Sequence, residues 1–320
     1  MPWLYRLAAF AALLPGWVAA AGPASVQFNM SWLPQGSMAG IVVAADKGFY
    51  RDAGIEVTLI RGFGAIRTAN ELDQGLFEFG YVDPLAVILN RANGGHVRMI
   101  APIIGRLPAG LCYVKERHYI ASPSQLTGLT AGGGQNSPMQ ALVPIWLKRN
   151  EIDPATVKVL GLDPAVVVSS LIAGKIDAAE CWKGNSLPLF QQQAAAAGLS
   201  IGMIAYADFG FDIPGSGLAA SDKLIAENPD LVRRFVQASQ TGYAYAAVHV
   251  DEALQLTLKR YPVLSPEVTR DQIVQTAELS DRKFDPAKMD RAVELMRDSG
   301  ASSGAVRPAD IYTTQFLQEP

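Results

Sequence analysis

The chain has 320 residues, of which 49% are hydrophobic and 18% charged, a composition typical of a globular protein of about two domains. The formal net charge is −3 with no basic stripe, which argues against a nucleic-acid-binding protein. Three histidines and two cysteines without metal-ligand spacing argue against a metal site, and no cofactor-binding motif is present. The sequence contains neither a G-x-S-x-G nucleophile elbow nor an evident Cys-His pair, so the protein is not expected to be an enzyme.

Residues 1–20 are predicted to be a signal peptide. Arg6 precedes an apolar run over residues 7–21, and small residues at 18–20 offer a cleavage site. Pro15 and Gly16 interrupt this run, which is shorter than the roughly 20 apolar residues that a membrane-spanning helix needs. No cysteine near the cleavage site could carry a lipid, so the sequence predicts a periplasmic protein without a lipid anchor.

The remaining chain alternates strand and helix patterns. Residues 24–33, 55–64 and 77–84 are predicted as strands, and residues 39–54 and 66–75 as helices. The same β-α-β-α-β order recurs over residues 129–182, and amphipathic helices dominate from residue 223 onward. This order predicts an α/β protein with mixed, mostly parallel sheets.

Two segments share a spacing that indicates an internal structural repeat. Leu72-x-x-Gly75-x-x-Glu78 and Leu171-x-x-Gly174-x-x-Asp177 each end a predicted helix and begin a strand. Five residues beyond each acid lie Asp83 and Trp182, which would then occupy equivalent strand ends. Open α/β sheets bind ligands at the carboxyl ends of their strands, so a cleft between two such lobes is expected.

A division into two lobes follows from this pattern. Residues 21–114 and 215–320 are expected to form a discontinuous first lobe, and residues 115–214 the second. The first boundary is set near Cys112–Glu116, in the predicted strand 110–116, and the return near residues 208–217, which are rich in Gly and turn residues. Cys112 and Cys181 lie in apolar runs and are interpreted as buried free thiols, with a single disulfide as the alternative.

The stretch SWLPQGSMAGIVVAADKGFYRDAGIEVTLIRGFG resembles the NMT1/THI5-like group of periplasmic solute-binding proteins. GLFEFGYVDP, GGGQNSPMQ and AGKIDAAECW fall where that group has further strand ends and helix starts. The resemblance implies a type II periplasmic-binding-protein fold with two lobes, two hinge crossings and a ligand between them. It also implies an ABC importer permease in the inner membrane as partner, and a monomeric protein. The ligands of the group include pyrimidine precursors of thiamine, riboflavin, sulfonates, nitrate and aromatic carboxylates.

Trp32 and Trp182 are candidates for stacking on a planar ligand from opposite lobes, with core packing as the alternative. Pro34 is expected to fix the loop after Trp32. Asp83 and Glu180 are candidate acceptors for ligand N–H groups, unless they serve as a helix cap or an ion pair. Strand alternation places Glu180 and Trp182 on one face of their strand and Cys181 on the other.

Asn136 and Ser137 follow a Gly-rich strand end and precede a helix, so they and nearby amides could bind an anionic group. The alternative is that Ser137 only caps the helix. Gly64 precedes a helix in the same way, so its amide is expected to face the cleft. Phe211 and Asp212, at the return crossing, could line the cleft or serve the hinge.

These features predict a substrate-binding component of an ABC transporter that captures a planar heteroaromatic, pyrimidine-like solute by lobe closure. An organic oxyanion such as a sulfonate, nitrate or aromatic carboxylate is the alternative ligand. Alternatives of another class are a cryptic periplasmic enzyme and a sensor lobe of a membrane receptor. Turnover of the ligand, or a receptor partner, would distinguish them.

Overall fold

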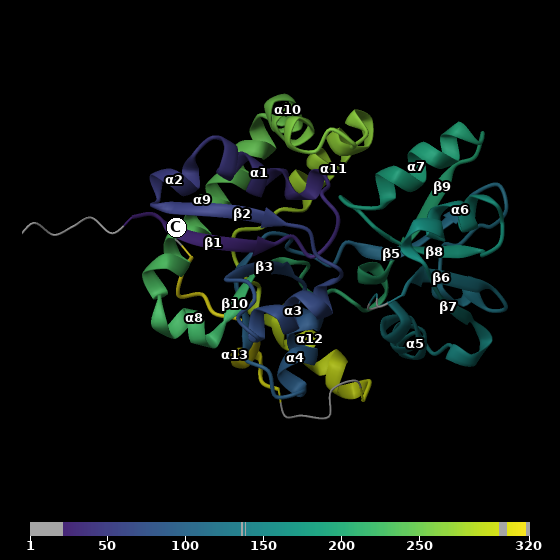
Figure 1. The fold of residues 1–320 in the computed structure, drawn as a ribbon. Helices are drawn as coiled ribbons and strands as arrows, with labels where there is room; N and C mark the ends of the chain where they lie inside the picture. Colours follow the sequence, from purple (N-terminus) through teal and green to yellow (C-terminus); the bar gives the residue numbers. More distant parts are fainter. Residues whose placement is uncertain (1–21, 136, 138, 301–305, 318–320) are drawn as a thin grey trace, which may run out of the picture.

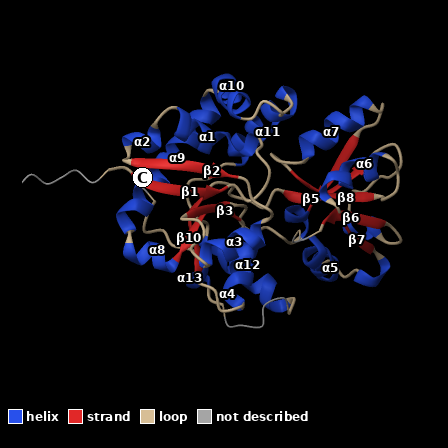
Figure 2. Ribbon diagram, viewed as in Figure 1, coloured by secondary structure: helices blue, strands red, loops and turns tan. Residues whose placement is uncertain are grey.

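The computed structural model describes residues 22–135, 137, 139–300 and 306–317; the predicted signal peptide and Asn136 lie outside them. Its strands form two five-stranded sheets, each flanked by helices (Figures 1 and 2). The strands of the first sheet are β1 (Ala24–Asn29), β2 (Ile55–Ile60), β3 (Phe79–Val82), β4 (Val97–Pro102) and β10 (Gly217–Ser221). Those of the second are β5 (Ala109–Val114), β6 (Thr130–Gly134), β7 (Lys158–Leu162), β8 (Ala178–Trp182) and β9 (Ile201–Ala205).

The helices divide in the same way between the two lobes. The first lobe contains η1 (Gly36–Met38), α1 (Ala39–Asp46), α2 (Phe49–Asp52), α3 (Ala65–Asp73), α4 (Pro84–Ala92), α8 (Asp222–Glu227), α9 (Pro229–Val248), α10 (Val250–Arg260), α11 (Pro266–Leu279), α12 (Pro286–Asp298) and α13 (Pro308–Ile311). The second contains η2 (Pro123–Leu126), α5 (Met139–Arg149), η3 (Pro154–Thr156), η4 (Pro164–Val166), α6 (Val167–Ile172) and α7 (Leu187–Ala196). No helix in the described part of the chain combines the length and apolar character needed to cross a bilayer.

The two sheets have the same topology. Their strand orders are β2-β1-β3-β10-β4 and β7-β6-β8-β5-β9. In the first sheet β10 is antiparallel to both of its neighbours and the other four strands run one way; β5 is the reversed strand of the second. The predicted α/β fold with mixed, mostly parallel sheets is therefore confirmed.

The predicted internal repeat is also confirmed. Gly75 and Gly174 both adopt left-handed backbone conformations, with φ of 72° and 71°, each two residues beyond the end of its helix, α3 or α6. Glycine ends a helix in this conformation without the steric cost of a side chain. Each helix then leads into the central strand of its sheet, β3 or β8, so Asp83 and Trp182 occupy equivalent strand ends.

The chain crosses between the lobes twice. The first crossing, residues 103–108, joins β4 to β5, and the second, residues 206–216, joins β9 to β10. The boundary set after residue 114 is wrong for residues 109–114, because β5 pairs with β8 and β9 of the second sheet. An apolar strand has the same sequence pattern whichever sheet it joins, so its pattern alone did not identify its partners.

Backbone hydrogen bonds join the two crossings into one ribbon. The amide of Ile104 donates to Ser216 O at 2.9 Å, Gly215 donates to Ile104 O at 3.1 Å, and Leu107 donates to Ile213 O at 2.8 Å. A side chain on Gly215 would meet that of Ile104 at 2.4 Å, so this close approach requires glycine.

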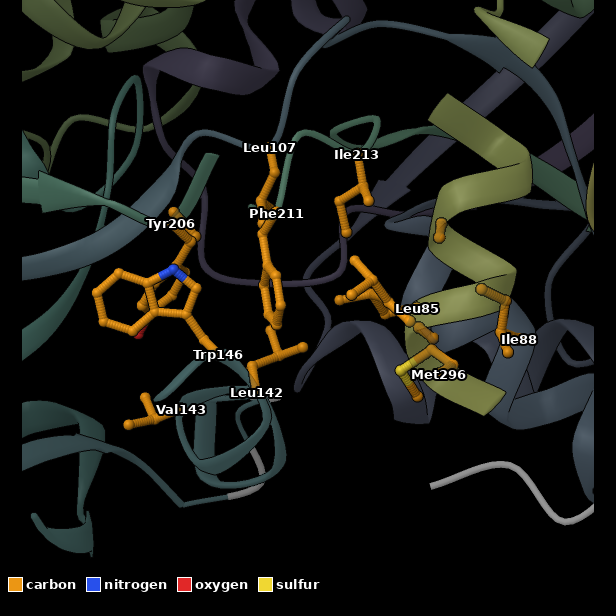
Figure 3. Packing of buried hydrophobic residues seen from close by; sticks show 14 of the residues in the cluster. Leu85, Ile88, Leu107, Leu142, Val143, Trp146, Tyr206, Phe211, Ile213 and Met296 are labelled. Atoms are coloured by element: carbon orange, nitrogen blue, oxygen red, sulfur yellow. The ribbon is translucent and has the colours of Figure 1, made fainter. Parts of the chain in front are cut away.

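A hydrophobic cluster surrounds this ribbon and contains residues from both lobes (Figure 3). Phe211 from the second crossing lies between Leu142 of α5 and Leu107 of the first crossing, with only 1% of its surface exposed. Leu85 of α4 and Met296 of α12 extend the cluster into the first lobe. The hinge is therefore packed as a core rather than left as a loose linker.

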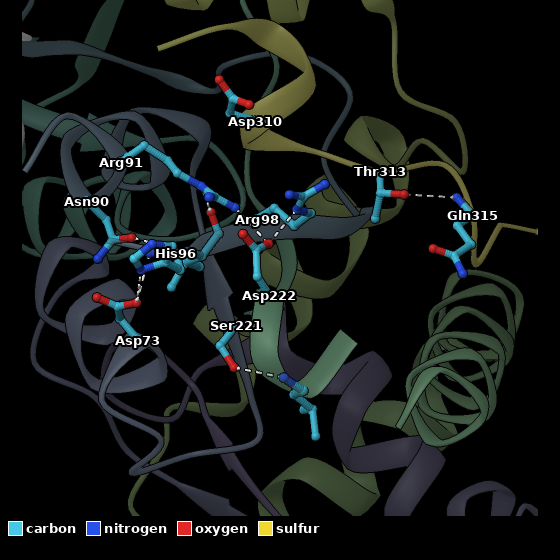
Figure 4. Close-up of polar contacts among 12 residues, drawn as sticks. Asp73, Asn90, Arg91, His96, Arg98, Ser221, Asp222, Asp310, Thr313 and Gln315 are labelled. Carbon is cyan, nitrogen blue, oxygen red and sulfur yellow. Dashed lines mark hydrogen bonds and ion pairs between the residues drawn. The ribbon is translucent and has the colours of Figure 1, made fainter. Parts of the chain in front are cut away.

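Polar contacts fix the far end of the first sheet, where β10 passes into α8 (Figure 4). The Asp222 carboxylate accepts from Arg91 Nη2 at 2.8 Å and from Arg98 Nε at 2.6 Å. The Ser221 hydroxyl caps α8 by accepting from the amide of Leu224 at 3.2 Å. These contacts join α4, β4 and the start of α8.

Cys112 and Cys181 form a disulfide between the adjacent strands β5 and β8. The interpretation as free thiols is therefore wrong. Cys112 pairs in register with Ala179, two residues before Cys181, so the two cysteines are diagonal neighbours on one face of the sheet. This antiparallel pairing between residues 69 apart in sequence could not be read from two isolated apolar runs.

Replacing both cysteines by alanine should lower the free energy of unfolding by about 2–4 kcal/mol, because the bridge restricts the unfolded chain. Urea unfolding of the wild type and the C112A/C181A variant measures this difference. In the same experiment, denatured but unreduced wild type should contain no thiol that reacts with a chromogenic reagent. Two reactive thiols would contradict the bridge.

Candidate ligand-binding site

The reversed strands bring the carboxyl ends of both sheets to the crossings. β5 begins directly after the first crossing, where Ala109 pairs with Trp182 at the end of β8. β10 begins directly after the second crossing, where Gly217 pairs with Val82 at the end of β3. The strand ends that carry Asp83 and Glu180 therefore meet at the junction of the lobes, where an α/β sheet binds its ligand.

Glu180 is the central polar residue of the second lobe's edge. Its carboxylate accepts from the Trp182 indole Nε1 at 2.9 Å and from the Ser137 hydroxyl at 2.5 Å. Both Glu180 and Trp182 are half-buried, while Cys181 between them points to the opposite face and is fully buried. The predicted alternation along β8 is confirmed, and Ser137, Glu180 and Trp182 are brought together as one polar and aromatic unit.

Asp83 is the counterpart of this unit in the first lobe. It is 3% exposed and caps α4 by accepting from the Ala86 amide at 2.9 Å. Burial raises the pKa of Asp83, although hydrogen bonds from the amides of Ala86 and Leu85 oppose the rise.

The charge of Asp83 acts on Glu180 across the lobes. Burial raises the pKa of Glu180, the hydrogen bonds from Ser137 and Trp182 lower it, and the negative charge of Asp83 raises it further. The site therefore concentrates two carboxyl groups whose ionised forms are disfavoured. A ligand that donates hydrogen bonds, or carries positive charge, would stabilise those ionised forms.

Trp32 lies in the loop between β1 and η1, half-buried, with Pro34 in the same loop. Its carbonyl accepts from the amide of Gly62, and the Ser31 carbonyl accepts from the amide of Gly64 at 2.7 Å. These bonds join the loops after β1 and β2 at the carboxyl edge of the first sheet. Gly64 has φ of 115°, a conformation that favours glycine. Its amide, which was expected to face the cleft, is engaged by the Ser31 carbonyl within the protein.

Asn29, which the sequence did not single out, organises these loops. It is fully buried at the end of β1, and its Oδ1 accepts from the amide of Ser31 at 2.9 Å. Its Nδ2 donates to Glu71 of α3 at 2.8 Å. A polar residue at the carboxyl end of a predicted strand was the available signal.

Phe211 and Asp212 lie in the hinge. Phe211 is enclosed in the hydrophobic cluster described above. The Asp212 carboxylate lies 3.0 Å from Arg106 Nε, 3.5 Å from Lys288 Nζ and 3.4 Å from Arg291 Nη1. Of the two roles considered for these residues, these contacts favour the hinge.

Basic residues around the junction already have acidic or aromatic neighbours. Lys183, next to Trp182, is paired with Glu278 of α11 at 3.3 Å. The guanidinium groups of Arg61 and Arg67 lie over the ring of Phe63, at 4.4 and 4.6 Å from its centroid. Within the described ranges, no group of three or more His, Cys, Asp or Glu side chains is arranged to hold a metal ion.

Two five-stranded sheets of this topology, joined by paired crossings, define a two-lobed periplasmic binding protein of type II. Residues 35–253 match the NMT1/THI5 like family, and the chain belongs to that family.

The chain is 28% identical over 310 residues to the riboflavin-binding protein RibY of Chloroflexus aurantiacus. This alignment covers 91% of this chain and 86% of the relative. A putative binding protein of Brucella abortus is 23% identical over 85% of this chain and 80% of its own.

Solved structures of sulfonate-binding proteins share the fold. The alkanesulfonate-binding protein SsuA of Xanthomonas axonopodis, bound to MOPS, superposes with a TM-score of 0.72 at 14% identity, covering 92% of this chain and 99% of that one. The aliphatic sulphonate-binding protein SsuA of Escherichia coli gives a TM-score of 0.71 at 15% identity over 93% of each chain. These relatives are binding proteins, and the chain is a solute-binding protein of the type that serves ABC importers.

The raised pKa of Glu180 predicts a pH-dependent effect of removing its charge. The folded state retains this proton to a higher pH than the unfolded chain, so ionisation costs stability as the pH rises between the two pKa values. The variant E180Q lacks this cost. Its free energy of unfolding should therefore increase relative to wild type as the pH rises through that window.

A control of opposite sign is E116Q. The Glu116 carboxylate accepts from the amide of Ser200 at 3.0 Å, which lowers its pKa, so wild type should lose stability relative to E116Q as the pH falls. Urea unfolding at several pH values measures both differences. A pH-independent difference for E180Q would contradict the assigned burial of this carboxyl.

Proposed function

We propose that the protein captures a planar heteroaromatic solute with N–H donors in the periplasm and delivers it to an ABC importer permease. The observation that supports this ligand class most directly is the Glu180 carboxylate, held by the Trp182 indole and facing the charge of Asp83. An ionised carboxylate accepts hydrogen bonds and cannot donate them, so it suits the N–H groups of a ring or an amino group. Trp182 and Trp32 then provide aromatic surfaces for the ring from opposite lobes.

An oxyanion ligand fits the same groups less well. The Ser137 hydroxyl, a candidate anion donor, is directed at Glu180, and the two acids in their ionised forms would repel a sulfonate or carboxylate. The nearby cation Lys183 is paired with Glu278. The riboflavin-binding relative supports the heteroaromatic class, and the sulfonate-binding relatives, at 14% and 15% identity, support the shared fold alone.

Ligand capture would use closure of the lobes about the paired crossings. Gln272 of α11 contacts both sides of the junction, since its Oε1 accepts from Gly36 and its Nε2 donates to Asn185 O at 2.6 Å. The Gly184 amide donates to Gln275 Oε1 at 2.7 Å. These bonds link the segments next to Trp32 and Trp182. A ligand that touches both tryptophans would favour the state in which these bonds form.

Export by a cleaved signal peptide, a monomeric state and docking to a permease belong to the same proposal. Site contacts are proposed for Trp32, Asp83, Ser137, Glu180 and Trp182. Absence of catalysis is part of the proposal too, and incubation of the bound solute with the protein should return it unchanged. Recovery of a chemically altered solute would favour the enzyme alternative.

Truncating Trp182 should weaken binding of a planar heteroaromatic. We expect W182A to raise the Kd by about 10- to 100-fold, because the variant loses the stacking surface and one hydrogen bond to Glu180. The matched control is Y119A, which removes a 77% exposed aromatic ring from the same lobe. Titration calorimetry with the solute co-purified from wild type compares them. Equal affinities of all three proteins would refute the site.

The ligand class itself is tested with riboflavin, thiamine and taurine in a thermal-shift screen. The proposal predicts that riboflavin or thiamine raises the melting temperature, since a ligand that binds only the folded state stabilises it, and that taurine does not. Stabilisation by taurine alone would refute the heteroaromatic class and support the oxyanion alternative.

A further inference from the structure

Two hydrogen-bond donors of the second lobe are buried without a partner. The Tyr206 hydroxyl and the Trp146 indole Nε1 have no hydrogen-bond acceptor among the described residues, and their side chains are 1% and 0% exposed. Their rings pack edge to face, with centroids 4.9 Å apart. Buried donors are nearly always paired in native proteins, so two unpaired donors side by side call for an explanation.

The strand register places Tyr206 on the same side of the second sheet as Glu180. Leu111 pairs with both Ile204 and Glu180, so Ile204 and Glu180 project from the same face. Tyr206 directly follows β9, two residues beyond Ile204, and both residues belong to the hydrophobic cluster that also contains Leu111. Trp146 lies in α5, which packs on this side, and Figure 3 shows its indole beside Tyr206.

Tyr206 is also electrostatically close to Glu180. Burial raises the pKa of the Tyr206 hydroxyl, and the charge of Glu180 raises it further. The hydroxyl therefore remains protonated and able to donate. The second lobe thus combines an acceptor, Glu180, with nearby donors that no protein group uses.

We propose that the Tyr206 hydroxyl, with the Trp146 indole N–H beside it, is a specificity-determining donor for a carbonyl oxygen of the ligand. The ligand would then be a heteroaromatic in which a carbonyl lies next to a ring N–H, as in the lactam and imide groups of pyrimidinones and flavins. Glu180 accepts from the N–H, and Tyr206 donates to the carbonyl. This assignment rests on the proposed function and narrows its ligand class.

The test uses Y206F, which keeps the ring and removes only the hydroxyl. Because the hydroxyl has no partner in the free protein, the melting temperature should be unchanged or higher. The Kd for riboflavin, which has a carbonyl next to a ring N–H, should rise about tenfold through loss of one hydrogen bond. The Kd for thiamine, which has no ring carbonyl, should not change.

The matched control is Y50F, because the Tyr50 hydroxyl is equally buried but is bonded to Ser239 Oγ at 2.8 Å. Y50F should lower the melting temperature by about 2 to 4 °C and leave the affinity unchanged. If Y206F behaves like Y50F, its hydroxyl is satisfied in the free protein and the proposal is overturned.

Failure of the proposed function gives a different result. If wild type binds taurine and neither heteroaromatic, the ligand class is wrong whatever Y206F does. Y206F measured with taurine would then show by an equal Kd that the hydroxyl does not contact ligand, which overturns the donor assignment. A higher Kd of Y206F for taurine would instead support the Tyr206 hydroxyl as a ligand donor, with a sulfonate oxygen as acceptor in place of a carbonyl.

Discussion

The architecture depends on one reversed strand in each sheet. Because β5 and β10 leave the crossings in the direction opposite to their neighbours, the parallel strands of both sheets must end at the crossings. This constraint, rather than any single contact, brings residues nearly a hundred positions apart, such as Asp83 and Glu180, to one junction. The backbone ribbon of the crossings then sets how closely the two edges approach.

The same geometry explains why acidic groups can be held where their ionised forms are disfavoured. Each acid has local donors that offset part of the rise in pKa caused by burial. These donors are the α4 amides for Asp83, and Ser137 and Trp182 for Glu180. Neither lobe supplies a cation for these two carboxyl groups in the described residues. Each lobe therefore contributes one carboxyl group without a cationic partner in the part of the chain that the structure describes. A solute that donates hydrogen bonds to both groups would favour the closed arrangement of the lobes.

The sequence predicted those features that depend on local order. Strand and helix periodicity, the paired Leu-x-x-Gly-x-x-acid segments and the strand-end positions of Asp83 and Trp182 all follow from neighbouring residues. Features that depend on which strands pair were missed. The sheet membership of residues 109–114 and the Cys112–Cys181 bridge both require the β5–β8 register, which no local pattern encodes.

The roles of single side chains were predictable only in part. Glu180 and Trp182 could be placed on one face by alternation, but the bond between them depends on rotamers. Asp212 was ambiguous because its partners Lys288 and Arg291 come from a helix more than seventy residues later. The sequence did not single out Tyr206 and Trp146, since the absence of a partner for a polar atom is a property of the folded packing.

The disulfide has a consequence for how the protein is made. Cys112 and Cys181 are the two cysteines of the whole sequence, so oxidation within one chain has a single possible product. No incorrect intramolecular pairing exists to be reshuffled, and a thiol oxidase alone, without an isomerase, is sufficient for the mature bond. The strand that carries Glu180 and Trp182 can thus be secured by a single oxidation step.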